Sequence, residues 1–349
     1  MKKAGRWIAL YAALICMSAA YSAQGAAQSK GKLQIYFIDV EGGQSTLFVT
    51  TAGQSLLIDT GWPDNDGRDA DRIAIAAKKA GISKIDYVLF THYHTDHVGG
   101  VPQLVARIPV GTFIDHGLNR ETTDAVTEHG YEAYQQILAS GKYKHIVARP
   151  GDVLPIPSLH ALVISADGNL IDHALSGGGE QNAYCKASET RPADQTENAR
   201  SLGVLITFGK LRILDLGDLT WDKEMQLMCP VNKLGHVDIL VVSHHGWNQS
   251  SSPALVDAIH PQVAIMDNGA TKGGSKATLE TFKKVPGLET LWQLHYSEEG
   301  GDADNTQAQF IANLQGPDNG NYLELNAAPD GKFSVSNPRT GETKAYTAK

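Results

Sequence analysis

The chain has 349 residues, of which 42% are hydrophobic and 7% aromatic. This composition supplies enough apolar side chains for a packed core and excludes a globally disordered chain. The formal net charge of −8 disfavours a protein that binds long nucleic acids, because such binding depends on basic side chains that neutralise phosphates.

Residues 1–27 have the pattern of a secretory signal peptide. A basic start precedes an apolar stretch from Trp7 to Met17, and small residues follow. The stretch is too short for a comfortable membrane span, and the alternative is an anchor helix that is retained. We therefore expect an exported protein, periplasmic or secreted. Its mature part, residues 28–349, is expected to contain no membrane span and has a formal charge of −11.

Hydrophobic periodicity and turn residues predict an α/β chain with a single domain. The expected elements, in chain order, are strands at 33–40, 45–50 and 55–59, a helix over 69–80, a strand at 85–90, a helix from 99 to 107, a strand at 110–114 and a helix over 121–140. Residues 165–200 show little periodicity and are interpreted as a long insert near the functional site.

The second half of the chain begins with two apolar strands joined by Gly209-Lys210 as a hairpin. The expected elements are these strands at 202–208 and 211–216, a helix through 224–227, a strand at 237–242, and strand, helix and strand at 262–266, 275–285 and 289–294. Residues 322–349 are interpreted as a C-terminal tail. The sequence leaves open whether Cys185 and Cys229 form a disulfide.

The segment from His92 to His97 reads His-x-His-x-Asp-His and is the most informative stretch of the chain. Imidazole and carboxylate together suit zinc, iron or manganese. Alternate residues of an extended segment point the same way, so His92 and His94 can bind one ion together. The chain then turns, and Asp96 and His97 can face a second ion. The alternative is a histidine-rich surface loop without metal, which the preceding buried strand disfavours.

Four predicted strand ends deliver side chains of the metal-binding type. These are Asp59, the cluster 92–97, Asp218, and the pair His244 and His245, each just after an apolar strand and beside a glycine. Because strand ends converge at one edge of a sheet, these groups are expected to meet in space.

With these motifs the chain resembles the metallo-β-lactamase superfamily over roughly residues 33–295. The resemblance implies a four-layer αββα sandwich with a site for one or two metal ions at one edge. Two Zn²⁺ ions are expected there, with Mn²⁺ or iron as alternatives. It further implies the following roles: His92 and His94 as ligands of the first metal, Asp96 and His97 as ligands of the second, Asp218 as the bridging carboxylate, Asp59 as the aspartate that steadies the metal loop, and His245 as the last ligand with His244 facing substrate.

One departure from the family pattern concerns the first metal. The family has a third histidine ligand about twenty residues before the bridging aspartate, and this chain has none at 197–201. Asn198 is the nearest match, and an amide oxygen is a weaker zinc ligand than imidazole. The alternative is that His173, from the insert, completes the site.

Within the superfamily, the chain most resembles the extracytoplasmic domain of competence-type DNA-uptake channel proteins. Those proteins have an Asp-Val-Gly-Gln-Gly-Asp-Ser turn after the first strand, and here residues 39–45 read Asp-Val-Glu-Gly-Gly-Gln-Ser, so Gln44 replaces the second aspartate. The same group includes phosphorylcholine esterases. The resemblance implies hydrolysis of a phosphodiester or related ester by a metal-bound hydroxide that Asp96 orients, while His244 stabilises the developing charge.

The predicted ligands leave other functions open. The same hydroxide would open a lactone or a β-lactam, and the missing third histidine supports a non-catalytic metal-binding protein. A small-molecule or anionic ester is the expected partner. His295 and Lys272 are candidate substrate contacts, although a solvated turn is the alternative for Lys272. The sequence contains neither a Gly-x-Ser-x-Gly elbow nor a P-loop pattern.

Overall fold

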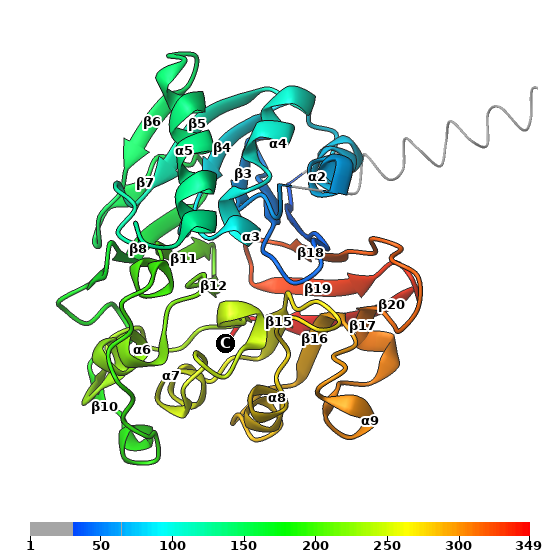
Figure 1. Ribbon diagram of the computed structural model, residues 1–349. Coiled ribbons are helices and arrows are strands. Elements are labelled where there is room, and N and C mark those ends of the chain that lie inside the picture. The colour runs from blue at the N-terminus through cyan, green and yellow to red at the C-terminus, as the bar shows by residue number, and fades with distance from the viewer. Residues whose placement is uncertain (1–30, 64) are drawn as a thin grey trace, which may run out of the picture.

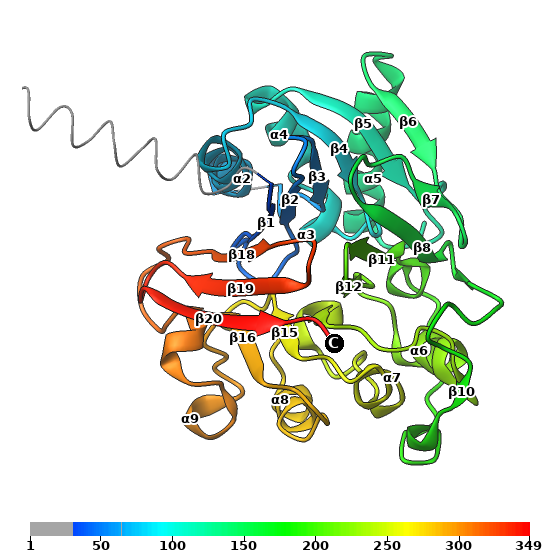
Figure 2. The same cartoon turned by 180° about the vertical axis from the view of Figure 1, so that it is seen from behind.

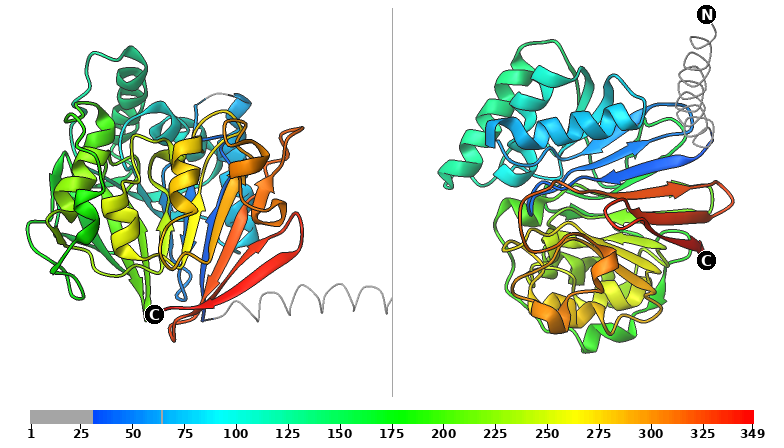
Figure 3. Two further views of the ribbon diagram at one scale, coloured as in Figure 1. Left: turned by 90° about the horizontal axis from the view of Figure 1, so that it is seen from below. Right: turned by 90° about the vertical axis from the view of Figure 1, so that its right-hand side faces the viewer.

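Two β-sheets pack face to face, with helices on the outer side of each. The computed structural model describes residues 31–63 and 65–349, so the predicted signal peptide at 1–27 lies outside the described residues. The two halves of the sandwich are seen from opposite sides in Figures 1 and 2, and the right-hand panel of Figure 3 shows the sheets between the two helix layers. The predicted single-domain αββα sandwich is confirmed.

The first sheet contains nine strands. They are β1 (Leu33–Phe37), β2 (Thr46–Val49), β3 (Ser55–Ile58), β4 (Ile85–Leu89), β5 (Val110–Asp115), β6 (Lys144–Val147), β18 (Leu323–Ala327), β19 (Lys332–Asn337) and β20 (Glu342–Thr347). Their order in the sheet is β20-β19-β18-β1-β2-β3-β4-β5-β6. Strands β3 to β6 are parallel, and the others pair antiparallel with their neighbours.

The second sheet also contains nine strands. They are β7 (Val153–Leu154), β8 (His160–Ala166), β9 (Asn169–Leu170), β11 (Gly203–Phe208), β12 (Leu211–Asp215), β14 (Ile239–Val241), β15 (Val263–Met266), β16 (Thr290–His295) and β17 (Ile311–Asn313). The order is β17-β16-β15-β14-β12-β11-β8-β7, with β9 paired to β8. Strands β12, β14, β15, β16 and β17 are parallel, whereas β12, β11, β8 and β7 pair antiparallel. A separate ribbon pairs β10 (Glu180–Gln181) with β13 (Val231–Asn232).

The helices cover the outer faces of the sheets. They are α2 (Arg68–Lys79), α3 (Thr95–Val98), α4 (Val101–Arg107) and α5 (Ala125–Ala139) on the first sheet, and α6 (Trp221–Met228), α7 (Pro253–Ile259), α8 (Lys276–Phe282) and α9 (Gly301–Asp304) on the side of the second. Among residues 31–63 and 65–349, no helix is both long and apolar enough to cross a membrane.

Three apolar clusters hold these layers together. Successive residues of a strand point to opposite faces, so Ile35 and Phe37 of β1 pack between the sheets while Tyr36 packs toward the helices. The middle cluster contains side chains from both sheets, and each outer cluster joins one sheet to its helices, as Ile73 of α2 and Leu255 of α7 illustrate. The alternation read from the sequence therefore matches burial on both faces.

Residues 322–349 differ from the predicted tail, because they form β18, β19 and β20 of the first sheet. Leu325 of β18 and Val335 of β19 are fully buried in the cluster between the sheets. The alternation of polar and apolar residues here is typical of half-buried strands, and the prediction of a tail did not use it. Strand β18 pairs with β1, which is distant in sequence, so the local pattern gave no sign of this partner.

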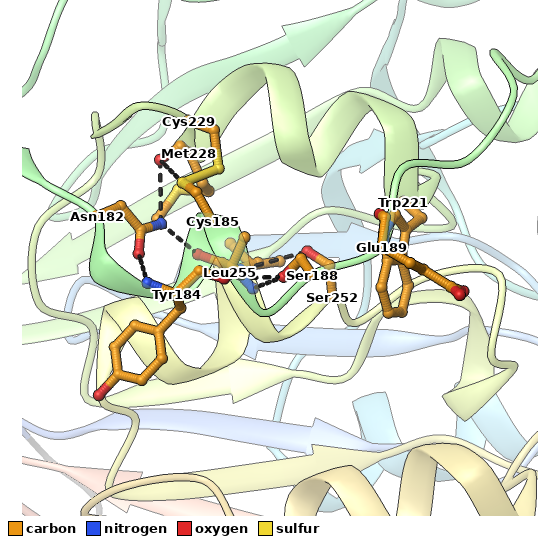
Figure 4. The surroundings of a disulfide bond; sticks show 11 residues. Asn182, Tyr184, Cys185, Ser188, Glu189, Trp221, Met228, Cys229, Ser252 and Leu255 are labelled. Carbon is orange, nitrogen blue, oxygen red and sulfur yellow. Dashed lines mark hydrogen bonds between the residues drawn. A yellow bond between two sulfur atoms is a disulfide. The ribbon is translucent and has the colours of Figure 1, made fainter.

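The region 165–200 also contains more structure than the predicted insert. It includes the end of β8, the short strands β9 and β10, and two 3-10 helices, η2 (Ala183–Lys186) and η3 (Glu197–Arg200). A disulfide joins Cys185 to Cys229, which follows α6 (Figure 4). Beside it, Asn182 Nδ2 donates hydrogen bonds to the carbonyls of Met228 (3.0 Å) and Ala254 (2.8 Å). The segment is thus fastened to α6 and α7.

The integration of β18 into the core yields a stability prediction. Leu325→Ala is expected to destabilise the protein by about 2–5 kcal/mol, because it leaves a cavity between the sheets. Thr347→Ala, at an exposed position of the same sheet, should change stability by less than about 0.5 kcal/mol. Urea unfolding measures both variants, and equal midpoints for the two would contradict the placement of β18 in the core.

The disulfide yields a second prediction. Cys185 and Cys229 are 44 residues apart in the sequence. Because their bond restricts the unfolded chain, it should stabilise the protein by about 2–4 kcal/mol. The double variant Cys185→Ser, Cys229→Ser should unfold at lower urea concentration than the oxidised protein, and a reductant should lower only the midpoint of the parent protein. An unchanged midpoint in the double variant would show that the bond does not form.

Candidate metal centre

The metal-type side chains follow strands whose carboxyl ends meet between the two sheets. Asp59 follows β3 and the segment 92–97 follows β4 in the first sheet, while Asp218 follows β12 and His244 follows β14 in the second. Both groups of strands are parallel to their neighbours, so their carboxyl ends lie at a shared edge. The predicted convergence is therefore realised by two sheets, each providing half of the centre.

Four buried side chains form the tightest group at this edge. Asp96, His97, Asp218 and His245 each offer one ligand atom, and these atoms all lie within 4.8 Å of one another. His97 Nε2 is 3.4 Å from Oδ2 of Asp96 and also 3.4 Å from Oδ2 of Asp218. His245 Nε2 is 3.1 Å from Asp96 Oδ2 and 3.5 Å from Asp218 Oδ1. The four atoms thus surround a single point.

A second pair of ligand-type atoms lies near the same oxygen of Asp218. His92 Nε2 and His94 Nδ1 are 3.0 Å apart, and His92 Nε2 is 3.9 Å from Asp218 Oδ2. The alternation of residues along the extended segment brings these two imidazoles together, as the sequence predicts. Asp218 therefore belongs to the group of four and also lies close to the His92–His94 pair.

Asp59 holds the histidine loop from behind. Its carboxylate accepts hydrogen bonds from the N–H of Thr91 (2.8 Å) and from Thr91 Oγ1 (2.6 Å), and it lies 2.7 Å from His97 Nδ1. This contact directs Nε2 of His97 toward Asp96 and Asp218. A carboxylate behind a histidine is the usual way in which a metal-binding imidazole is oriented.

Asn198 and His244 lie next to each other beside Asp218. His244 Nε2 lies 3.5 Å from Asp218 Oδ2 and 3.4 Å from Asn198 Nδ2. Asn198 Oδ1 is buried and has no hydrogen-bond partner among the described residues. His173, the alternative for completing the first site, is instead exposed and pairs with Asp172, its neighbour in sequence.

Strongly opposed electrostatic effects meet at this centre. Burial alone would raise the pKa of the Asp218 carboxyl, but His245, His97 and His244 hold it well below its usual range. Lys272 and His97 do the same for Asp96. Burial lowers the pKa of His244 to about 4. For His245, burial and Lys272 lower the pKa, but Asp218 and Asp267 outweigh them and raise it to about 10.

The two candidate substrate contacts have different surroundings. Lys272 forms an ion pair with Asp96, donates to the carbonyl of Gly42 at 2.6 Å, and lies 5.2 Å above the ring of Trp62. It therefore borders the centre, and the solvated turn is not its environment. His295 is buried and pairs with Asp39 at 2.7 Å, so its ring is used in a network beside the centre.

The donor set fits a divalent cation. Histidine nitrogen and aspartate oxygen are the ligands that zinc and related metals prefer. Asp218 Oδ1 and Asn198 Oδ1 are buried without hydrogen-bond partners among the described residues. A buried oxygen without a partner destabilises the folded protein unless a ligand binds to it. The buried histidine–aspartate group is thus suited to a metal ion.

Sequence reasoning missed two carboxylates near the centre. Glu121 lies 3.0 Å from His94 Nε2, and Glu197 lies 3.0 Å from His116 Nε2. Glu197 stands one position before Asn198, and Glu121 follows the β5 end that carries His116. The available signals were the place of Glu121 after the end of β5 and that of Glu197 beside Asn198, which went unused because neither belongs to a motif.

The comparisons with known proteins agree with this geometry. The profile of the Metallo-beta-lactamase superfamily matches residues 39–176, which include Asp59 and the segment 92–97. Over these residues the chain is similar to the metallo-β-lactamase superfamily, and its two sheets flanked by helices form the metallo-β-lactamase fold. The buried Asp96, His97, Asp218 and His245 are side chains of the kind that hold the metal in metal-dependent hydrolases of this fold.

Relatives of this metallo-β-lactamase-fold protein are distant. Recombination protein 2 of Haemophilus influenzae is 26% identical over 69% of this chain and 25% of its own length. Competence protein ComA of Neisseria gonorrhoeae is 24% identical over 64% of this chain and 25% of its own length. A UPF0173 metal-dependent hydrolase of Cupriavidus taiwanensis is 21% identical over 78% of this chain and 87% of its own length. The chain thus spans about a quarter of the two proteins named for recombination and competence.

A buried glutamate anchors the loop beside His244. The Glu224 carboxylate accepts hydrogen bonds from the N–H groups of Ser251 (2.8 Å) and Ser252 (2.6 Å). The preceding residue, Ser250, has its Oγ 3.4 Å from His244 Nδ1. Burial raises the pKa of Glu224 to about 7, although the two N–H groups oppose this effect.

This pKa predicts a pH dependence of stability. The folded value of about 7 exceeds that of an unfolded glutamate, about 4.3, so the folded protein holds the proton more tightly. The resulting stabilisation is complete below about pH 4 and is lost as the pH rises through about 7. The free energy of unfolding should therefore fall between these pH values by up to about 3 kcal/mol less in Glu224→Gln than in the parent protein. Urea unfolding measures this difference. The exposed Glu132→Gln is the control, and equal slopes in both variants would contradict the prediction.

Proposed function

We propose that this protein is an exported hydrolase that uses a two-zinc centre to cleave a phosphodiester or a related small anionic ester. The observation that carries the proposal is the position of Asp218. Its Oδ2 lies 3.9 Å from Nε2 of His92, in the pair, and 3.4 Å from Nε2 of His97, in the group of four. One carboxylate between two sets of ligand atoms suits a pair of ions.

The residues divide into two ligand sets. His92, His94 and Asn198 would hold one ion, and Asp96, His97 and His245 would hold the other, with Asp218 shared between them. Bound there, divalent ions lower the pKa of water toward about 7 and polarise the ester. His245 is preferred to His244 as a ligand, because only His245 lies within the group of four.

The remaining side chains would act on substrate and proton. Asp96 is placed to orient the attacking water, since its Oδ2 borders His97, His245 and Lys272. His244 would donate a hydrogen bond to the substrate oxygen on which charge develops. Lys272 would contact an anionic group of the substrate. Neither Asp96 nor His244 needs to move from its buried position for these roles.

Three observations support a small phosphodiester and an exported protein. Residues 39–45 resemble the turn of competence-type channel proteins, and relatives of this chain are named for recombination and competence. The net charge of −8 disfavours long nucleic acids and leaves small anionic esters as substrates. The basic and apolar pattern of residues 1–27 supports export.

Two other functions would use the same residues. Lactone or β-lactam opening requires the same ligands, so substrate profiles must separate it from phosphodiester cleavage. A binding-only protein is favoured by Asn198 in the place of the third histidine, because an amide holds the first ion less firmly.

The test compares turnover of bis(p-nitrophenyl) phosphate, nitrocefin and a simple lactone by zinc-loaded protein. We expect phosphodiester cleavage that His94→Ala reduces at least about 100-fold and that His129→Ala, at an exposed position of α5, leaves unchanged. Faster turnover of nitrocefin or the lactone would contradict the substrate class. Metal binding without turnover of any of the three would contradict catalysis.

A further inference from the structure

Glu121 contacts the ring nitrogen of His94 that faces away from the metal centre. Its Oε2 lies 3.0 Å from His94 Nε2, while His94 Nδ1 lies 3.0 Å from His92 Nε2. The carboxylate and the other histidine therefore occupy opposite sides of the His94 ring. Glu121 thus stands behind a ligand and is not a ligand of the same ion.

This contact selects one form of the His94 ring. A neutral imidazole has one N–H and one lone pair, and a carboxylate favours the N–H on the nitrogen that it contacts. With the proton on Nε2, the lone pair is on Nδ1 and points toward His92 Nε2. The ring is then prepared for an ion on the Nδ1 side.

The same carboxylate oxygen also holds the segment that carries Asn198. Glu121 Oε2 accepts a hydrogen bond from the N–H of Glu197 at 2.7 Å, and Glu197 begins the 3-10 helix η3. In return, Glu197 Oε1 accepts a hydrogen bond from the N–H of Arg120 at 2.7 Å. The loop after β5 and the η3 segment are therefore joined in both directions.

A buried histidine strengthens this junction. His116 Nε2 lies 3.0 Å from Glu197 Oε2, and both side chains are fully buried. The backbone of Glu121 is itself fixed, because its N–H donates to Asn119 Oδ1 at 2.9 Å. The backbone of Glu121 is thus held in a local turn, and its carboxylate contacts two partners.

We propose that Glu121 is a positioning residue that couples the orientation of His94 to the η3 segment and so compensates for the missing third histidine ligand. The inference rests on the proposed metal-binding role of His92 and His94. In a site with three histidines, each ring restrains the ion directly. Here two imidazoles and an amide must hold it, so the arrangement of His94 relative to Asn198 matters more.

The test measures zinc affinity of metal-free protein by competition with a chromophoric chelator, for wild type, Glu121→Ala, Glu121→Gln and Glu132→Gln. We expect one zinc ion to bind about 10–100-fold more weakly to Glu121→Ala, the usual effect of losing a carboxylate behind a ligand. Glu121→Gln should show a smaller loss, because its oxygen can still accept from the N–H of Glu197, while its NH2 group can also face His94 Nε2 and so no longer selects one tautomer of that ring. Glu132→Gln, the same change at an exposed site of α5, should bind as wild type does.

A second readout reports on the ring itself. Nitrogen-15 NMR of the metal-free protein should show His94 protonated at Nε2 in wild type and a mixture of tautomers in both Glu121 variants. Wild-type zinc affinity together with an unchanged His94 tautomer in Glu121→Gln would overturn the proposal, even if the alanine variant failed to fold. Failure of wild type to bind zinc would instead overturn the proposed function, so the two failures are distinguishable.

Discussion

The buried Asp218 carboxylate is the contact on which the rest of the centre depends. It is almost fully buried, and its Oδ2 lies 3.4 Å from His97 and 3.5 Å from His244. Burial disfavours the ionised form of a carboxyl group unless positive charge surrounds it. Imidazoles from two sheets provide that charge, so the sandwich must close before Asp218 finds its partners.

Three residues of this centre have a left-handed backbone conformation. Asp59, His244 and His245 have positive φ values of 60°, 57° and 53°, which non-glycine residues adopt at a cost of about 1–3 kcal/mol each. The surrounding fold must supply that energy. Gly273 makes room for this backbone, because a Cβ at that position would lie 2.2 Å from the carbonyl oxygen of His245. Such strain is typical of functional sites and agrees with the concentration of ligand atoms here.

Much of this site could be predicted from the sequence because its residues follow recognisable strands. An apolar run that ends in Asp59, Asp218 or His245 indicates both a strand and the direction in which it points. The histidine segment adds a spacing that the local backbone alone converts into paired ligands. For these residues the local pattern and the tertiary structure carry the same information.

The remaining contacts join residues whose separation in sequence hides the partnership. His295 was a candidate for substrate contact, yet it pairs with Asp39, 256 positions away. Gln44, which replaces an aspartate of the family turn, donates to the buried Asp215 at 2.7 Å, where a second carboxylate would be repelled. Glu121 and Glu197 likewise meet only because the two sheets close. Patterns of hydrophobicity describe single elements and say little about such pairs.

The most direct test of the account is a crystal structure of the zinc-loaded protein with anomalous data collected at the zinc edge. The account predicts two anomalous peaks about 3.5–4 Å apart, one beside His92 and His94 and the other beside His97 and His245, with Asp218 contacting both. A map without a peak at Asp218, or with zinc bound elsewhere in the chain, would contradict it.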